Sequence, residues 1–183
     1  MFADLPSFAA WRFVDAVDGF EVMYAEPGGL RGHTSAVEDN RAYAVSYEIT
    51  LDEQWRTREV QVSSDTLAGQ RRTVLLSDGQ GRWTVDGRPA PHLDGLFDVD
   101  LEASACTNTL PVHRMTLPVG EAVVAPAVYV QALDLVARRL DQTYRRLDDH
   151  RFDYRSEGDF HAVLAYDDAG LVVEYPGIAV RFA

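Results

Sequence analysis

The stretch AYAVSYEITL, residues 42–51, alternates large apolar side chains with small or polar ones at every second position. The large side chains belong to Tyr43, Val45, Tyr47 and Ile49. Successive side chains of a β-strand point to opposite faces, so a period of two predicts a strand with one buried face. This stretch indicates a sheet protein, and similar patterns continue on both sides of it.

Strands and tight turns fill most of the chain around that stretch. QWRTREVQVS, residues 54–63, also alternates, but neither face is purely apolar, which predicts a polar interior or a bulge. Asp78-Gly79 and Asp86-Gly87 flank the short strand RWTV and are typical of hairpin turns. Residues 160–183, FHAVLAYDDAGLVVEYPGIAVRFA, predict three further strands separated by turns.

Residues 131–149 fit two interpretations. Leu133, Val136, Leu140, Tyr144 and Leu147 fall at helical spacing, and no other segment is as compatible with a helix. With a period of two, the same segment predicts a strand, followed by a turn at Asp148-Asp149 and a second strand within residues 150–156. The hairpin is the favoured interpretation, and the helix stays open.

The predicted fold is all-β and mainly antiparallel, a single domain over residues 1–183 with at most one short helix. No linker, low-complexity tract or repeat divides the chain. On the order of ten or more strands in a chain of this size predict two packed sheets, a curled sheet or a half-open β-barrel. A curled sheet of that size can enclose a small ligand.

Composition narrows the classes of function. The 183 residues include 17 cationic side chains, all arginine, so Schiff-base and P-loop lysines are excluded. A net charge of -12 disfavours nucleic acid and anionic membrane faces as partners. The lone Cys106 fits a reducing compartment, and no signal peptide or membrane span is expected, so the expected location is cytoplasmic without membrane insertion. Oligomeric state is left open.

Three acidic residues form a row in LDGLFDVDLEAS, residues 93–104. Asp98, Asp100 and Glu102 stand at i, i+2 and i+4, so a strand would present all three on one face. The row lacks the glycine and terminal glutamate of a calcium loop, which favours a solvated or arginine-paired face over a metal site. The five histidines show no zinc-ligand spacing, and no metal or cofactor is expected.

Catalytic motifs are weak. Cys106 and His113 lie seven residues apart and could form a thiol nucleophile with its base, but a buried free cysteine is favoured. The chain lacks G-x-S-x-G, and its β pattern does not suit an α/β-hydrolase. We expect a protein without enzymatic activity.

One polar segment, TNTLPVHR at residues 107–114, differs from ordinary sheet sequence. Thr107, Asn108 and Thr109 either cap a turn or, with Arg114, form a hydrogen-bonding set at the mouth of a hollow sheet. Four tyrosines could add apolar faces with polar tips to such a site, or could simply pack in the core. These are Tyr129, Tyr144, Tyr154 and Tyr175.

Several motifs, read in order, resemble a bacterial glycolipid-binding family, formerly a domain of unknown function. They are Thr57-Arg58 with Val60, DGQGRW (78–83) with Val85-Asp86-Gly87, DVDL (98–101), TNTLP (107–111) with Arg114, Gln142-Thr143-Tyr144 with Phe152-Asp153-Tyr154, and GLVVEYPG (170–177). The resemblance covers nearly the whole chain. It implies a fold similar to lipoprotein carriers, an open antiparallel β-barrel whose concave side receives acyl chains, with no catalytic residues to carry over.

The first functional hypothesis is therefore binding of a glycolipid or other amphiphile in the concave interior. Its polar end would meet Arg58, Asn108 and Arg114, and the DVDL row, including Asp100, offers a carboxylate to an inward arginine. A second hypothesis is a hydrolase of a sugar or acyl ester that uses Asp98 and Asp100. A third is a packed interaction module without a ligand.

Overall fold

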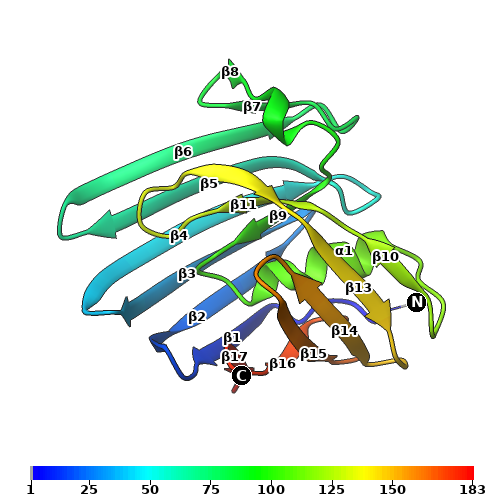
Figure 1. Cartoon of the computed structure of the whole chain (residues 1–183). Helices are drawn as coiled ribbons and strands as arrows, with labels where there is room; N and C mark the ends of the chain where they lie inside the picture. Colours follow the sequence, from blue (N-terminus) through cyan, green and yellow to red (C-terminus); the bar gives the residue numbers. More distant parts are fainter. Residues whose placement is uncertain (1) are drawn as a thin grey trace.

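The computed structural model describes residues 2–183, and one antiparallel sheet of 14 strands dominates it (Figure 1). In spatial order the strands are β10 (Ala122–Val124), β13 (Gln142–Arg146), β14 (Arg151–Ser156), β15 (Phe160–Tyr166), β16 (Val172–Tyr175), β17 (Ala179–Arg181), β1 (Phe8–Phe13), β2 (Val17–Glu26), β3 (Gly29–Glu38), β4 (Arg41–Leu51), β5 (Thr57–Thr66), β6 (Gly69–Ser77), β7 (Trp83–Val85) and β8 (Arg88–Pro89). Pairing of β1 with β17 joins the two halves of the chain in the middle of the sheet.

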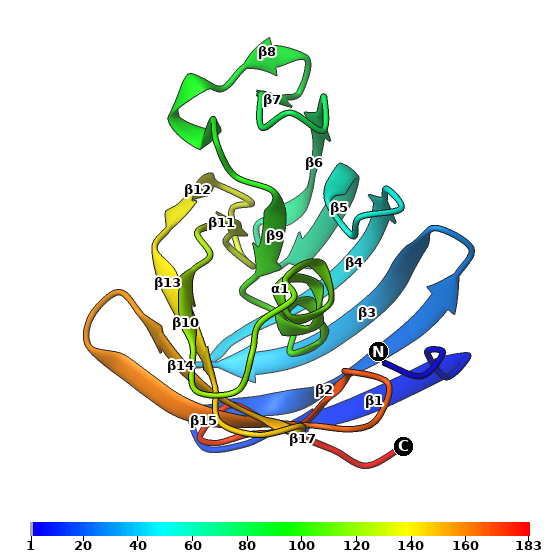
Figure 2. The same ribbon diagram turned by 90° about the vertical axis from the view of Figure 1, so that its right-hand side faces the viewer.

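The sheet curls strongly but does not close into a barrel (Figure 2). Its concave side holds a small sheet of β12 (Ala137–Leu140), β11 (Ala127–Val130) and β9 (Asp98–Leu101), in which β9 and β11 are parallel. Two helical turns, η2 (Cys106–Asn108) and α1 (Thr109–Arg114), follow β9, and a further turn, η1 (Pro91–Leu93), precedes it. We call residues 98–114 the plug. The mainly antiparallel fold with one short helix is confirmed.

The plug changes the expected picture of an empty concave interior. Its helix α1 lies inside the curl of the sheet (Figure 2), and Leu110 and Cys106 are fully buried there. The chain thus fills much of its own concave side, because the inward faces of the long strands bury more apolar surface against a packed segment than against an open hollow. Two hollows remain beside the plug, each lined in part by plug residues.

The alternation in residues 42–51 is borne out by β4. Its Tyr43, Val45, Tyr47 and Ile49 are buried, and the side chains between them are exposed or half-buried. Strand β4 pairs along its length with β3 and β5, so its buried face belongs to the centre of the core.

Polar side chains on the inward face of the sheet hold the backbone that packs against it. Thr34 donates a hydrogen bond to the carbonyl of Ala103 at 2.5 Å, and Ser64 donates to the carbonyl of Ala132 at 2.6 Å. Thr57 accepts a hydrogen bond from the backbone N–H of Val99 at 3.2 Å. These bonds satisfy buried backbone groups of the segments packed on the sheet. Thr57 is the member of this set that lies within the mixed pattern of residues 54–63, where a polar interior was expected.

Glu21 makes the most extensive of these links. Its side chain is fully buried, and it accepts hydrogen bonds from the Tyr47 hydroxyl at 2.6 Å and from the hydroxyl of Ser104. The backbone N–H groups of Ala105 and Cys106 donate to its other oxygen at 2.8 and 3.3 Å. Burial raises the pKa of Glu21, and these four hydrogen bonds oppose the rise.

Gly32 makes room for the Tyr47 ring that reaches Glu21. A Cβ atom at Gly32 would lie 2.2 Å from the Tyr47 hydroxyl oxygen and 2.3 Å from the ring carbon that carries it. The ring therefore passes directly over the backbone of β3, which only glycine allows.

The expected bulge is also present, between β4 and β5. Thr50 pairs with Glu59 while Leu51 pairs with Thr57, so Arg58 has no partner across this strand pair. Because of the extra residue, the buried side chain that follows Thr57 along β5 is Val60, three positions later, instead of the residue two positions later. The prediction that Trp55 continues this strand is wrong, because β5 begins at Thr57 and Trp55 adopts a turn conformation with φ of 62°.

Residues 131–149 form strands, which settles the ambiguity in favour of the hairpin. Strand β13 pairs antiparallel with β14, with Tyr144 opposite Tyr154. The one α-helix lies instead at residues 109–114, which the sequence assigned to a turn or a recognition loop. Six residues are too few for a hydrophobic pattern to show a helical period, so this helix could not be recognised from its sequence.

Among residues 2–183, no helix is long and apolar enough to cross a membrane.

Candidate functional site

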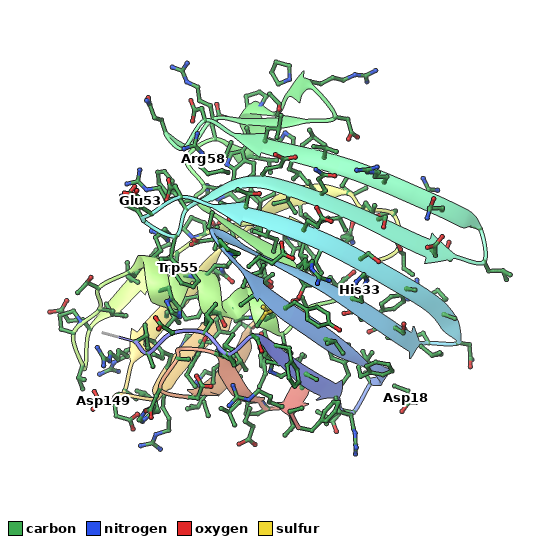
Figure 3. All side chains as sticks on the ribbon, turned by 180° about the vertical axis from the view of Figure 1, so that it is seen from behind. Asp18, His33, Glu53, Trp55, Arg58 and Asp149 are labelled. Carbon is green, nitrogen blue, oxygen red and sulfur yellow. The ribbon has the colours of Figure 1, made fainter. Side chains whose placement is uncertain are left out.

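A hollow of about 370 Å³ lies between the plug and one end of the curled sheet. Its aromatic lining consists of Phe13, Tyr43, Tyr129, Tyr154, Phe160 and Tyr175. Its acidic lining consists of Glu38, Asp100, Glu102 and Glu157. We call it the tyrosine hollow. Val17 also lines it, which places it at the end of the molecule where Asp18 is labelled in Figure 3.

Asp100 forms part of the buried wall of the tyrosine hollow. Its side chain is only 8% exposed, and Thr107 donates a hydrogen bond to its Oδ1 at 3.0 Å. Within residues 2–183 no group donates to its Oδ2, and this atom is not sealed from solvent. Burial raises the pKa of Asp100 to about 6; the Thr107 hydrogen bond opposes the rise, and the nearby charges of Asp98 and Glu102 add to it.

Three aromatic rings form one corner of the hollow. Tyr154 and Tyr175 meet edge to face with centroids 5.9 Å apart, and Phe160 lies 6.0 Å from each. Tyr154 also donates a hydrogen bond to Gln142 at 2.9 Å. Burial raises the pKa of both tyrosines, so their hydroxyls stay protonated at neutral pH, and Tyr154 uses its single proton in the bond to Gln142.

The opposite wall carries a charged network at its rim. Tyr129 donates a hydrogen bond to Glu102 at 2.7 Å, and the Arg138 guanidinium lies 4.7 Å from the Tyr129 ring centroid. Arg138 pairs with Glu157 at 2.8 Å. The rim thus already holds one cation, the guanidinium of Arg138, against an aromatic ring and a carboxylate. Tyr43 also lines the hollow, and burial raises its pKa to about 12.

Asn108 joins the plug to the tyrosines behind the hollow. It lines the hollow, and its side-chain oxygen accepts a hydrogen bond from the Tyr144 hydroxyl at 2.8 Å. Tyr166 donates to the backbone carbonyl of the same residue at 3.2 Å. Tyr144 itself is fully buried, with its ring 5.0 Å from that of Tyr154, so it supports the wall without facing a ligand.

The two threonines on either side of Asn108 play internal roles. Thr107 orients Asp100 and accepts a hydrogen bond from the backbone N–H of Leu101 at 3.3 Å. Thr109 is fully buried at the start of α1, and its hydroxyl has no hydrogen-bond partner in the described part of the chain. Neither residue lines the hollow directly.

Arg114 turns away from the hollow and pairs with Asp98. Its guanidinium donates to both carboxylate oxygens, at 2.8 and 2.7 Å, and Asp98 is 0% exposed. The predicted pairing of an inward arginine with the DVDL row is confirmed, but the predicted solvated face is not, because β9 is buried. Burial raises the pKa of Asp98, and the hydrogen bonds from Arg114 oppose that rise.

Arg58 lies on the same side of the molecule as Trp55 and far from Asp18 (Figure 3). It donates to the carbonyl of Ser77 at 3.2 Å and approaches Asp52 at 3.9 Å. The expected cluster of Arg58, Asn108 and Arg114 does not form, because the bulge takes Arg58 off the inward face and Asp98 holds Arg114. The mixed pattern of residues 54–63 indicated a bulge and the DVDL row indicated a carboxylate partner, but neither pattern showed that Arg58 and Arg114 would be kept apart from Asn108.

A second hollow, about 890 Å³, lies at the Trp55 end of the molecule and was not predicted. His113 stacks on Trp55 with centroids 3.8 Å apart and bonds to the carbonyl of Ala169 at 2.8 Å. Burial lowers the pKa of His113 to about 4, so its ring is neutral at physiological pH.

Cys106 is fully buried beside Glu21, and no hydrogen bond joins it to His113 among the described residues. The favoured interpretation of Cys106 as a buried free cysteine is confirmed.

Residues 2–183 contain no group of three or more histidine, cysteine, aspartate or glutamate side chains arranged to hold a metal ion. Asp98 and Asp100 lie on the same face of β9, but Arg114 occupies the first. Glu102, which follows the strand, is turned to Tyr129 and the backbone of Ala132. The three carboxylates of the predicted row therefore each have different partners.

Fold and site define an antiparallel β-sheet protein whose curled sheet encloses a plug of its own chain beside a hollow large enough for a small molecule. The chain belongs to the family described as "Putative glycolipid-binding", whose model matches residues 9–181. The crystal structure of a DUF1089 family protein from Pseudomonas aeruginosa is similar over 100% of this chain and 98% of that one. The two are 32% identical, with a TM-score of 0.86. No curated protein matches the chain.

Proposed function

We propose that this protein binds an amphiphilic small molecule, without transforming it, and that the polar head of the ligand occupies the tyrosine hollow. The observation that carries the proposal is the lining of that hollow. Tyrosine rings with protonated hydroxyls and a buried carboxylate with a free oxygen converge there. Pockets of this size with a few convergent polar groups on an apolar wall are typical ligand sites. The family description supports a glycolipid as the ligand.

The apolar part of the ligand would follow the remaining wall. Phe13, Val17, Leu140 and Ile178 line the hollow between the sheet and the small inner sheet. An alkyl chain laid there removes apolar surface from water on both partners, which favours association. The tail therefore would lie along the edge of the curl, since the plug already fills the centre.

The alternative hypotheses receive less support. A hydrolase that uses Asp98 with Asp100 needs both carboxylates at one cleft, whereas Arg114 holds Asp98 inside the core. A packed module without a ligand is consistent with the plug but leaves the tyrosine hollow and the free oxygen of Asp100 without a role.

Native mass spectrometry of freshly purified protein, followed by competition with a fluorescent amphiphile, tests the proposal. Ser156 lines the hollow, so Ser156→Trp should fill it and lower probe affinity at least about tenfold, while the exposed Ser35→Trp on β3 leaves affinity unchanged. Wild-type protein that carries no amphiphile and binds no probe would overturn the proposal. If Ser156→Trp and Ser35→Trp bind the probe with equal affinity, the tyrosine hollow is not the binding site.

A further inference from the structure

The tyrosine hollow has a strongly unequal charge. Its lining contains four carboxylates and a single guanidinium, that of Arg138. Arg138 is already paired with Glu157, so the carboxylates of Glu38, Asp100 and Glu102 remain without a cationic partner in the described part of the chain. A ligand that enters this hollow meets a negative field in surroundings that screen it less than bulk water does.

Asp98 and Asp100 provide an internal comparison. They lie two residues apart on the same strand, and both are buried, 0% and 8% exposed. Asp98 has the two-pronged Arg114 pair, whereas Asp100, which lines the hollow, accepts one hydrogen bond from the Thr107 hydroxyl and none at its Oδ2 from residues 2–183. Buried carboxylates are normally paired with a cation because an isolated buried charge is unfavourable. A cation that pairs with Asp100 would approach it through the hollow, because Asp100 lines that space.

The aromatic lining is also suited to a cation. Rings of Tyr43, Tyr129, Tyr154 and Tyr175 surround the same space as Asp100. Aromatic faces attract ammonium groups, and clusters of such rings recognise substituted amines. The guanidinium of Arg138, 4.7 Å from the Tyr129 ring centroid, already makes this kind of contact at the rim.

We propose that the ligand of the tyrosine hollow carries an ammonium group that pairs with Asp100 and lies among the tyrosine rings. This inference rests on the proposed function and adds the charge of the head group to it. Two chemical sources share this feature, a primary amine such as that of an amino sugar and a quaternary amine. The neutral sugar of an ordinary glycolipid lacks it.

Calorimetric titration at pH 8 with three amphiphiles of equal tail length tests the inference. The probes are decylammonium, decyltrimethylammonium and neutral decyl maltoside, each below its micelle concentration. We expect at least one of the two cations to bind about tenfold or more tightly than the maltoside. The stronger of the two identifies a primary or a quaternary amine as the source.

Variants separate the site from the overall charge of the protein. Asp100→Asn should remove the preference for the cation, so that the ratio of cation affinity to maltoside affinity falls to about one. Glu174→Gln makes the same change of charge at an exposed position of β16 outside the hollow, and should keep the preference. Glu38 also lines the hollow, and Glu38→Gln should reduce the preference for the cation less than Asp100→Asn does. Glu38→Gln replaces Asp100→Asn in the test if Asp100→Asn does not fold.

The outcomes distinguish this inference from the function on which it rests. If the maltoside binds wild-type protein as tightly as both cations, the ammonium inference is overturned and the proposed function stands. If none of the three binds, the proposed function fails together with it. If Glu174→Gln reduces the preference as much as Asp100→Asn, net charge explains the effect and the pairing with Asp100 is wrong.

Discussion

Asp98 and Asp100 show how one strand can place two buried carboxylates in different chemical situations. The first is held by Arg114 through two hydrogen bonds, and the second keeps a free oxygen toward the tyrosine hollow. A paired buried carboxylate anchors the plug, whereas an incompletely paired one lowers stability and is retained where a ligand needs it. Stability and binding should therefore respond differently to changes at these two positions.

Replacement of Arg114 should reduce stability before it affects binding. In Arg114→Gln the carboxylate of Asp98 stays fully buried without a cation, so we expect the free energy of unfolding to fall by about 3 kcal/mol. Urea denaturation measures the loss, and the double variant Asp98→Asn/Arg114→Gln should recover part of it. Weaker amphiphile binding at unchanged stability would instead place Arg114 in the binding site.

Asp100 should make stability depend on pH in the direction opposite to that of an ordinary surface carboxylate. Its folded pKa of about 6 exceeds the ordinary value of 3.8 for an aspartate, so the folded state holds the proton more tightly. Stability from this group therefore falls as pH rises from about 4 to about 6, by up to about 3 kcal/mol. Asp98 and Glu102 raise this pKa, while Thr107 and Arg138 oppose the rise.

The comparison of Asp100→Asn with wild type isolates that effect from other carboxylates. The difference in free energy of unfolding should shift in favour of the variant between pH 4 and pH 7, as measured by urea denaturation at each pH. A constant difference across this range would show that Asp100 titrates near its ordinary pKa in the folded protein.

The plug depends on the strands that surround it for its structure. Helix α1 has six residues, too few to be stable alone, and it contains Pro111 in its first turn. Glu21 on β2 fixes the approach to this helix by accepting hydrogen bonds from Ser104, Ala105 and Cys106. The position of the plug, and with it one wall of the hollow, is thus set by a distant strand.

Glu21→Gln should loosen the plug. The oxygen of a glutamine amide can still accept from the N–H groups of Ala105 and Cys106 only if its NH2 group turns to the hydroxyls of Tyr47 and Ser104, which must then stop donating to residue 21. The neutral amide oxygen is also a weaker acceptor than a carboxylate. We expect the free energy of unfolding to fall by about 2 kcal/mol and amide exchange to rise over residues 104–108. Glu48→Gln on the exposed face of β4 is the control; equal exchange in both variants would contradict this role of Glu21.

At the scale of the whole molecule, a single sheet extends through both halves of the chain. The pairing of β1 with β17 connects the N-terminal strands to the C-terminal hairpins, and the plug contacts both. Neither half buries its apolar face without the other. The chain should therefore behave as a single cooperative unit.

Chemical unfolding should accordingly proceed in one transition. Trp11, Trp55 and Trp83 lie in β1, in the β4–β5 turn and in β7, so tryptophan fluorescence samples separate regions. Its midpoint should coincide with that of far-ultraviolet circular dichroism. Two resolved transitions would show that the halves unfold independently.

The sequence by itself determined the sheet. Period-two alternation, as in residues 42–51, directly reports which side chains are buried, and turn residues such as Asp86-Gly87 mark where strands end. It also indicated Asp100, Asn108 and three of the four candidate tyrosines that line one hollow, and all of these except Tyr129 belong to the motifs that carry the family resemblance.

Only the tertiary structure decided what fills the concave side and where each arginine points. The plug is held by single hydrogen bonds between residues far apart in the chain, such as Glu21 with Ala105, and no local pattern records them. One extra residue at Arg58 reverses the facing of a strand, and a carboxylate sixteen positions away captures Arg114. Periodicity describes a strand and its two faces, whereas pairing between distant side chains is fixed only when the chain has curled and buried them together.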